Sequence, residues 1–276
     1  MDRKIVVITG ANQGIGFESA RRLVRKSDLH VVITARDEER GQMAIDKIRE
    51  ETPQANIELM ILDLDDDESL EAFVEDLSKK FSAIYCLVNN AGHGSFDADA
   101  AKAEATMKTN FFQTVKLTDR MLPLLQKFKN ARVVTVASET STALFNNADE
   151  KLKKRVVAPG FTTADIWEIG KEYVEAVREG PPEERGLPGF GESYFMSKLC
   201  VRQYFQAFAQ EHPELVVATC CPGWCHTNLG GETAPRKPED GAEIVEYIVS
   251  QDLDGKSGEF WQDSKISPRL QLALSE

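Results

Sequence analysis

The sequence lacks the residue patterns that are typical of metalloproteins, membrane proteins and nucleic-acid-binding proteins. Its four histidines are scattered and show no HExxH or Cys/His ligand spacing, so we expect no metal site. No apolar run approaches the length of a membrane span or of a signal-peptide core. A net charge of −12 repels phosphate backbones and anionic lipids. We therefore expect a cytoplasmic protein with no nucleic-acid or membrane partner.

The cysteines do not indicate a disulfide framework. There are five, an odd number, and Cys86 and Cys220 stand in apolar, strand-like runs. This placement is typical of reduced, buried thiols. Cys221 and Cys225 are not a convincing pair of metal ligands either.

Apolar, strand-like runs alternate with amphipathic helical runs along the 276 residues. The expected strands are 4–9, 30–35, 57–62, 84–88, 132–137 and 215–221, with a last short one near 259–261, and the expected helices are 15–26, 38–50, 67–80, 104–129, 193–211 and 239–249. Such alternation requires right-handed crossovers and gives a parallel sheet covered by helices on both faces. The sequence predicts a single α/β domain over residues 1–276, with a doubly wound Rossmann fold whose ligands bind beyond the carboxyl ends of the strands.

A glycine motif, TGANQGIG, occupies residues 9–16 between the first strand and the first helix. This arrangement aims backbone N–H groups and the positive end of the helix dipole at a phosphate, and the missing side chains allow close approach. A dinucleotide is the natural ligand. The residues expected to hold it are Gly10, Asn12, Gln13, Gly14, Ile15 and Gly16.

A second motif, YxxxK, places Tyr194 and Lys198 four residues apart on an expected helix. Residues at this spacing share one face, so the ammonium can lie beside the phenol and lower its pKa. Tyr194 would then be a usable acid near neutral pH. An isolated pair of this kind is usually a solvated helix face, but downstream of a nucleotide motif it indicates chemistry.

The order of the motifs resembles the short-chain dehydrogenase/reductase family: TGxxxGxG, then NNAG at 89–92, a serine after a buried strand, and YxxxK. TMKTNFF at 106–112 and CCPGW at 220–224 are more closely similar to the monomeric NADPH-dependent carbonyl reductases. The resemblance runs from Lys4 to about Trp261. It implies an enzyme that transfers a hydride from NADPH to the carbonyl of ketones, aldehydes or quinones.

The resemblance implies four catalytic residues. Tyr194 donates a proton to the carbonyl oxygen, and Lys198 also holds the nicotinamide ribose hydroxyls. Ser138 hydrogen-bonds the carbonyl oxygen, although Thr140 and Ser141 stand just after it. Asn110 holds a water that joins Lys198 to a proton relay; its alternative role is a buried amide that locks a helix.

The residues at the end of the second expected strand favour NADPH over NADH. An acidic residue at its end would select NAD, and none stands there. Arg36 follows directly, and a guanidinium can grip the 2′-phosphate. Asp37 could instead pair with Arg36, or take the acidic role if the strand ran two residues longer. Relatives that prefer NADP often carry a second basic residue in the glycine loop, where this chain has Asn12 and Gln13.

Further cofactor contacts are implied by the resemblance. Asp63 and Leu64 are similar to the family's adenine clamp, although a helix cap is the alternative, since three more aspartates follow closely. Thr227 would hold the nicotinamide carboxamide. The remaining implied cofactor residues are Asn90, Pro222 and Gly223.

The stretch between Ser138 and Tyr194 is too long to lack structure. Thr162 and Asp165 match a capping box, the following residues keep helical spacing, and Gly-Pro-Pro at 180–182 ends that helix. The monomeric carbonyl reductases carry an insertion here. This implies that 142–191 covers the surface through which other relatives oligomerise, leaves a monomer, and forms one wall of the substrate pocket.

Four aromatic residues are candidates for the substrate pocket. Trp224, Phe96, Phe190 and Trp167 are candidates for an apolar pocket, and packing in the core or on the surface is an equal alternative. Of these, Trp224 joins Ser138 and Tyr194 as an expected substrate contact. The alternative functions are a narrow-specificity NADPH ketone reductase of secondary metabolism and a nucleotide-sensing regulator with the same fold.

Overall fold

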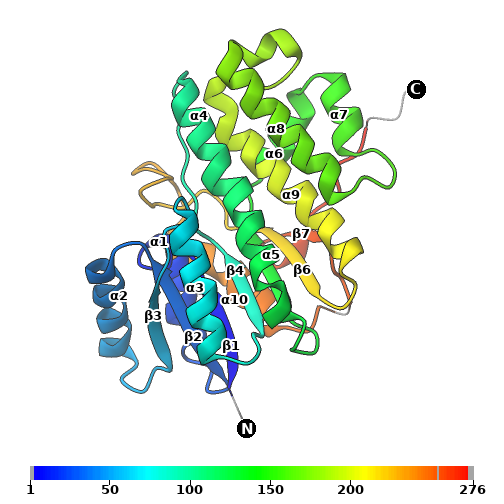
Figure 1. Ribbon diagram of the computed structural model, residues 1–276. Helices are drawn as coiled ribbons and strands as arrows, with labels where there is room; N and C mark the ends of the chain where they lie inside the picture. Colours follow the sequence, from blue (N-terminus) through cyan, green and yellow to red (C-terminus); the bar gives the residue numbers. More distant parts are fainter. Residues whose placement is uncertain (1–2, 254, 273–276) are drawn as a thin grey trace.

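Eight strands form one sheet in the order β3-β2-β1-β4-β5-β6-β7-β8 in the computed structural model, which describes residues 3–253 and 255–272 (Figure 1). Their bounds are β1 (Lys4–Ile8), β2 (Leu29–Ala35), β3 (Ile57–Ile61), β4 (Cys86–Asn89), β5 (Arg132–Val136), β6 (Val216–Cys221), β7 (Glu259–Gln262) and β8 (Lys265–Ile266). All pairings from β3 to β7 are parallel, which confirms the doubly wound α/β prediction. The antiparallel β8 was not expected.

Helices cover both faces of the sheet, and the strands alternate their side chains between two apolar clusters. Val6 and Ile8 face the cluster under one helical layer, while Val7 faces the other. The first layer contains α1 (Gly14–Leu23), α2 (Glu38–Glu51) and α10 (Pro238–Ser250). The second contains α3 (Asp67–Lys80), α4 (Ala100–Met107), α5 (Thr114–Leu125) and α9 (Ser193–Glu211). Because both faces are covered, the central strands are apolar on both sides.

The single helix expected over 104–129 is instead three segments, which corrects that prediction. α4 begins earlier because the Asp99 side chain caps it, accepting from the Lys102 N–H at 2.9 Å. A π-helical turn (Lys108–Gln113) separates α4 from α5. α5 ends at Leu125, and the turn into β5 contains Asn130 in the left-handed region. Single π turns are frequent at functional sites, and Asn110 lies on this one.

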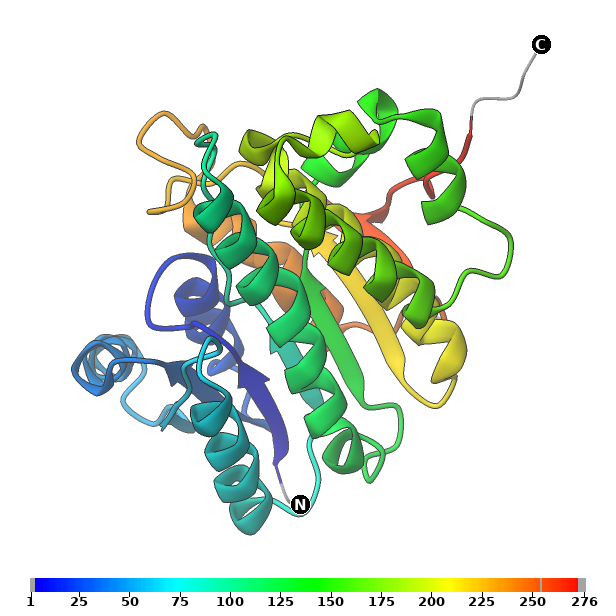
Figure 2. The same cartoon turned by 45° about the horizontal axis from the view of Figure 1, so that its top comes forward.

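The segment before Tyr194 forms α6 (Thr140–Asn147), α7 (Glu150–Val156), α8 (Thr163–Glu179) and two short 3₁₀ turns (Pro182–Arg185 and Phe190–Glu192). The reciprocal capping box of Thr162 and Asp165 is present, and Gly180 ends α8, as predicted. Figure 2 shows α8 running alongside α9, and it also packs against α4. No helix in the described part of the chain is long and apolar enough to cross a membrane.

Candidate active site

The glycine loop gives α1 a bare N-terminus. Gly10 and Gly14 have φ values of +60° and +59°, which favour glycine. Gln13 stands at the N-cap, but its side chain makes no capping hydrogen bond. The first N–H groups of α1 therefore lack partners within the helix and face the carboxyl end of β1. This is the geometry of an anion site, and it suits the diphosphate of a dinucleotide.

The loop is held by residues at the ends of β1 and β4, which are neighbours in the sheet. The Asn90 side-chain amide donates to the carbonyl oxygens of Thr9 at 2.8 Å and Gly10 at 3.2 Å. In return, Thr9 Oγ1 accepts from the backbone N–H groups of Asn90 at 3.0 Å and Ala91 at 2.9 Å. Asn90 therefore shapes the loop with both donors of its side chain. Thr9 was not singled out from the sequence, although it begins the motif.

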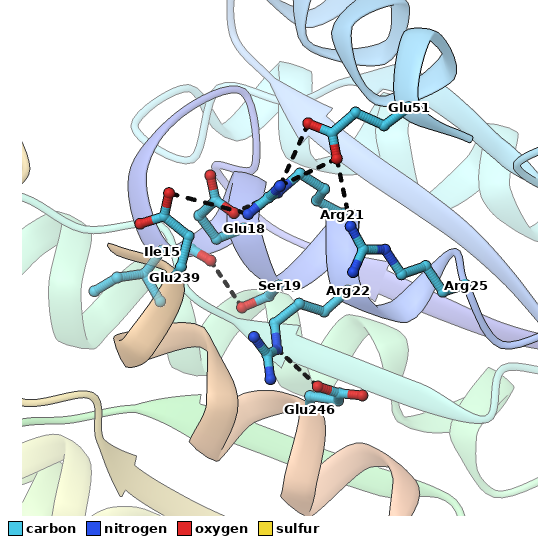
Figure 3. Close-up of polar contacts among 9 residues, drawn as sticks. All are labelled: Ile15, Glu18, Ser19, Arg21, Arg22, Arg25, Glu51, Glu239 and Glu246. Atoms are coloured by element: carbon cyan, nitrogen blue, oxygen red, sulfur yellow. Dashed lines mark hydrogen bonds and ion pairs between the residues drawn. The ribbon is translucent and has the colours of Figure 1, made fainter. Parts of the chain in front are cut away.

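Ion pairs hold α1 from its outer side (Figure 3). Arg21 contacts Glu18 on its own helix at 2.5 Å and Glu51 at the end of α2 at 3.1 Å. Arg22 contacts Glu246 of α10 at 2.7 Å. Burial is the main cause that raises the pKa of Glu18, and the Arg21 hydrogen bond opposes it. These contacts fix the direction of α1 against its two neighbours, and with it the aim of the helix N-terminus.

Arg36 follows the end of β2 at Ala35, so the strand does not run two residues longer. The Asp37 side chain caps α2, accepting from the Arg40 N–H at 2.8 Å. The alternative acidic role for Asp37 therefore loses its support. Arg36 is exposed, and its side chain makes no hydrogen bond or ion pair with another described residue. Its guanidinium is available for an anion beside the nucleotide loop.

Asp63 lies just after β3, and it does not cap α3. That cap is Asp66, which accepts from the Glu68 N–H at 2.9 Å. One Asp63 oxygen accepts from the Asp65 N–H at 3.0 Å, and the other makes no hydrogen bond within residues 3–253 and 255–272. Leu64 is buried in the core cluster. The geometry thus leaves a carboxylate oxygen at the strand end, where an exocyclic amine could donate to it.

Three predicted catalytic residues meet at the carboxyl ends of β5 and β6. Lys198 lies one turn after Tyr194 on α9, with Nζ 5.6 Å from the centre of the tyrosine ring. Lys198 Nζ also donates to the Val136 carbonyl oxygen at the end of β5, at 2.7 Å. Ser138, two residues further on, lies close enough to the Tyr194 phenol to oppose the rise of its pKa.

Asn110 completes this group from the π-helical turn. Its side-chain amide donates to the His93 carbonyl oxygen at 2.7 Å and to Ser197 Oγ at 3.0 Å, and its oxygen accepts from the His93 N–H at 2.9 Å. Asn110 Oδ1 and Lys198 Nζ both border Gly92, at 2.9 and 3.9 Å from the position that a Cβ would occupy there. The structural role considered from the sequence is therefore present, since Asn110 locks the loop after β4 onto α9.

The loop after β6 lies next to the glycine loop. The Thr227 methyl group is 3.4 Å from the position of a Cβ on Gly14. Thr227 Oγ1 accepts from the Gly230 N–H at 3.0 Å, and Trp224 Nε1 donates to the Gly230 carbonyl oxygen at 2.8 Å. The expected nicotinamide residue thus lies close to the N-terminus of α1.

Exposed apolar side chains surround Tyr194. Phe96 is 58% exposed, and its ring lies edge-on to the tyrosine ring at 5.8 Å. A Cβ on Gly94 would be 2.7 Å from the tyrosine ring and 3.2 Å from Leu229, which comes from the loop that carries Trp224. Sequence patterns gave no signal for Gly94 or Leu229, because both act through contacts between separate loops.

The other two pocket candidates lie largely in the core. The Trp167 ring packs on Phe111 at 5.8 Å and Phe112 at 4.8 Å, so the packing interpretation is right for this residue. Phe190 is partly buried against the same core cluster. Its neighbour Gly191 contacts Phe96, because a Cβ there would be 3.1 Å from the Phe96 carbonyl oxygen. The end of the insertion therefore supports one side of the apolar surface near Tyr194.

Burial controls the ionisation of Tyr194 and Lys198. It raises the pKa of Tyr194 to about 12, and the hydrogen bond with Ser138 opposes this shift. The pKa of the phenol is therefore raised overall, rather than lowered as expected from the sequence, because desolvation of the phenolate is the largest effect. Burial also lowers the pKa of Lys198 to about 8. The phenol is thus protonated at neutral pH, the state that a proton donor requires.

Known proteins with similar sequences decide the family. A family model described as short chain dehydrogenase matches residues 4–149. The chain belongs to the short-chain dehydrogenase/reductase family. Carbonyl reductase (NADPH) 1 of Mus musculus is 34% identical, covering 96% of this chain and 98% of the relative, and that of Homo sapiens is 31% identical, covering 95% and 97%. Among solved structures, salutaridine reductase from Papaver somniferum matches with a TM-score of 0.86 and 26% identity, covering 94% of this chain and 99% of that one.

As a short-chain dehydrogenase/reductase, the chain is an oxidoreductase that uses a nicotinamide dinucleotide and a small-molecule substrate. The geometry agrees with this class of reaction, because the nucleotide loop and the proton donor lie at the same edge of the sheet. Within the described residues, no group of three or more His, Cys, Asp or Glu side chains is arranged to hold a metal ion.

The lowered pKa of Lys198 predicts a pH dependence for this short-chain dehydrogenase/reductase. We expect kcat/KM for reduction to fall as pH rises through about 8, because the ammonium loses its charge there rather than at its ordinary value of 10.5. Tyr194 titrates only near 12 and does not contribute to this fall. The effect of Lys198 on stability has the opposite sign. Between pH values of about 8 and 10.5 the unfolded state binds more protons than the folded state, so the free energy of unfolding increases as pH rises through this window.

The measurement is a pH–rate profile from about pH 6 to 10. Lys198→Arg is the matched comparison, since its residual activity should lack this fall because a guanidinium stays charged. A wild-type profile in which kcat/KM stays flat from pH 6 to above about 9.5 would contradict the role of the Lys198 ammonium.

Proposed function

We propose that this protein is an NADPH-dependent carbonyl reductase acting on ketones, aldehydes or quinones. The observation that carries the proposal is the meeting of Tyr194, Ser138 and Lys198 beside the glycine loop. The apolar, exposed surface at Phe96 and Leu229 supports a hydrophobic carbonyl substrate. The names of two similar relatives, the carbonyl reductases (NADPH) 1 of Mus musculus and Homo sapiens, support the same nucleotide.

The residues present suit the nucleotide. The bare N-terminus of α1 would take the diphosphate, Arg36 the 2′-phosphate, Asp63 the adenine amine and Thr227 the carboxamide. When bound, NADPH supplies a hydride to the carbonyl carbon.

The chain's own side chains manage the charge that this transfer creates on the carbonyl oxygen. Ser138 donates a hydrogen bond to that oxygen, and the Tyr194 phenol gives it a proton. Lys198 holds the ribose hydroxyls and places a positive charge beside the phenol, so it stabilises the phenolate as the proton leaves. Phe96 and the loop at Gly94 pack against the tyrosine ring and cover part of it, which limits the access of water.

Arg36 should determine the preference for NADPH. We expect Arg36→Ala to weaken NADPH binding by about 10- to 100-fold, since a charge-assisted hydrogen bond is worth roughly 1.5–3 kcal/mol. NADH binding should stay unchanged, because NADH has no 2′-phosphate. Fluorescence titration with both nucleotides measures the two constants. Arg25→Ala is the control, an exposed arginine on the loop after α1 that pairs with Glu51. Equal affinities of wild type and Arg36→Ala for NADPH would refute this role.

The function itself is tested by following cofactor absorbance with NADPH or NADH over menadione, isatin and aromatic aldehydes. NADPH oxidation over several of these compounds, lost in Tyr194→Phe, would establish a broad carbonyl reductase. No oxidation of either nucleotide in the presence of any carbonyl would contradict the proposal.

A narrower ketone reductase is a second candidate, favoured by the similarity to salutaridine reductase over nearly the full length. Tight NADPH binding with turnover of only one ketone would identify it. The insertion covers α4 and α9, which supports the expected monomer. The monomeric state and the cytoplasmic location remain predictions.

A further inference from the structure

The loop over residues 222–237 connects β6 to α10 and carries Trp224 and Thr227. Its outer part has little support of its own, because Trp224 is 58% exposed and the hydrogen bonds that join Trp224 and Thr227 to Gly230 lie within the loop. One hydrogen bond, from Asn228 Nδ2 to Gln13 Oε1 at 3.2 Å, joins the loop to the glycine loop. These bonds give the loop a shape but do not attach it to the sheet. Its position over the glycine loop therefore depends on contacts made by other residues.

Arg236 binds the two ends of this loop together through its backbone. Its carbonyl oxygen accepts from the His226 N–H at 2.8 Å, and its N–H donates to the Trp224 carbonyl oxygen at 3.2 Å. Cys225 and Arg236 thereby form a parallel bridge. The returning strand of the loop is thus paired with the segment that lies between Trp224 and Thr227.

The Arg236 side chain extends this attachment to the sheet. It crosses Gly223, where a Cβ would be 2.6 Å from Arg236 Cδ, and the φ of Gly223 is +80°. Arg236 Nη1 then donates to Asp263 Oδ1 at 2.8 Å, in the turn between β7 and β8. The hydrogen bond that Arg236 donates to the Asp263 carboxylate is the main cause that raises the pKa of Arg236. Arg236 therefore contacts the loop on one side and the sheet on the other.

We propose that Arg236 is a positioning residue, which clamps the loop of Trp224 and Thr227 to the β7–β8 turn. It acts through those two residues and touches neither substrate nor cofactor. The proposal rests on the proposed function, in which Thr227 holds the nicotinamide end of NADPH. The clamp sets the distance between that end and Tyr194, whereas the adenosine end depends on α1 and Arg36.

Two variants separate the parts of the clamp. Arg236→Ala removes the packing over Gly223 and the ion pair. Asp263→Asn removes only the charge, since asparagine accepts the φ of +47° found at this position. Arg269→Ala is the matched control, because it breaks a 2.6 Å ion pair with Glu259 on β7 but has no contact with the loop.

We expect Arg236→Ala to lower kcat by about 10- to 100-fold, the cost typical of a reacting group displaced by about 1 Å. The dissociation constant of NADPH should change by less than about threefold, because the adenosine contacts remain. Asp263→Asn should lower kcat less than Arg236→Ala does. Arg236→Lys should also retain more kcat than Arg236→Ala, because lysine keeps the charge and the aliphatic stem. Arg269→Ala should keep kcat within about twofold.

Hydrogen exchange tests the clamp without any need for turnover. The amides of His226 and Gly230 should exchange faster in Arg236→Ala, and to a lesser degree in Asp263→Asn, while those of β1 and β5 stay unchanged. Unchanged exchange in the loop would overturn the clamp, and faster exchange with wild-type kcat would overturn its effect on catalysis.

If Arg236→Ala does not fold, Asp263→Asn and Arg236→Lys decide by the same criteria. Faster loop exchange in a protein that reduces no carbonyl would support the clamp and sink the proposed function instead.

Discussion

Tyr194→Phe should lower kcat for carbonyl reduction by about 10²- to 10⁴-fold, the usual cost of removing a positioned acid. Phenylalanine keeps the ring contact with Phe96 and the cation–π contact with Lys198. It removes only the hydroxyl, with its interaction with Ser138 and its proton. Because the glycine loop is untouched, the NADPH dissociation constant should stay within about threefold. The expected result is thus a loss of turnover without a loss of binding.

Single-turnover absorbance kinetics and NADPH titration measure these two quantities on the same preparation. Tyr204→Phe is the matched control, since Tyr204 lies on the same helix but packs in the core against Phe205 and Phe208. That variant should lose a little stability and retain its kcat. Activity of Tyr194→Phe within tenfold of wild type would rule out the phenol as the proton donor.

The fold could be predicted wherever the sequence pattern is strong over a whole element. α8 was predicted because Thr162, Asp165 and Gly180 mark both of its ends. β8 is only two residues long, too short for any periodicity to show. The π-helical turn at Lys108–Gln113 was missed because one extra residue in a turn hardly alters the spacing of apolar residues over the whole helical run.

Only part of the candidate site could be predicted from the sequence. The motif residues meet where the doubly wound fold requires, because the carboxyl ends of β1, β4 and β5 lie at one edge of the sheet. The pKa of Tyr194 could not be predicted, since it depends on burial by Phe96 and other residues distant in sequence. The choice between Arg36 and Asp37 needed the exact end of β2 and the cap of α2, which sequence patterns place only within a few residues.

Gly16→Ala should abolish most NADPH binding by disturbing the glycine loop from inside. A Cβ on Gly16 would meet Asn90 Nδ2 most closely, and would lie 2.8 Å from the Gly10 carbonyl oxygen and 2.9 Å from Ala11 Cα. Two of these neighbours are backbone atoms of the loop, and the third is the amide that holds the loop in place. None can move without shifting the N–H groups that receive the diphosphate.

Alanine is favoured over glycine in a helix by about 1 kcal/mol, so any loss in Gly16→Ala must be steric. We expect NADPH affinity to fall by at least about 100-fold and the free energy of unfolding to fall by about 1–3 kcal/mol, as for an overpacked site. Calorimetric titration and thermal melting with and without NADPH measure both effects. Gly160→Ala is the control, because nothing lies within 4 Å of a Cβ there and its strain at φ +72° is remote from the site. An NADPH dissociation constant within threefold of wild type in Gly16→Ala would mean that the diphosphate does not bind at the start of α1.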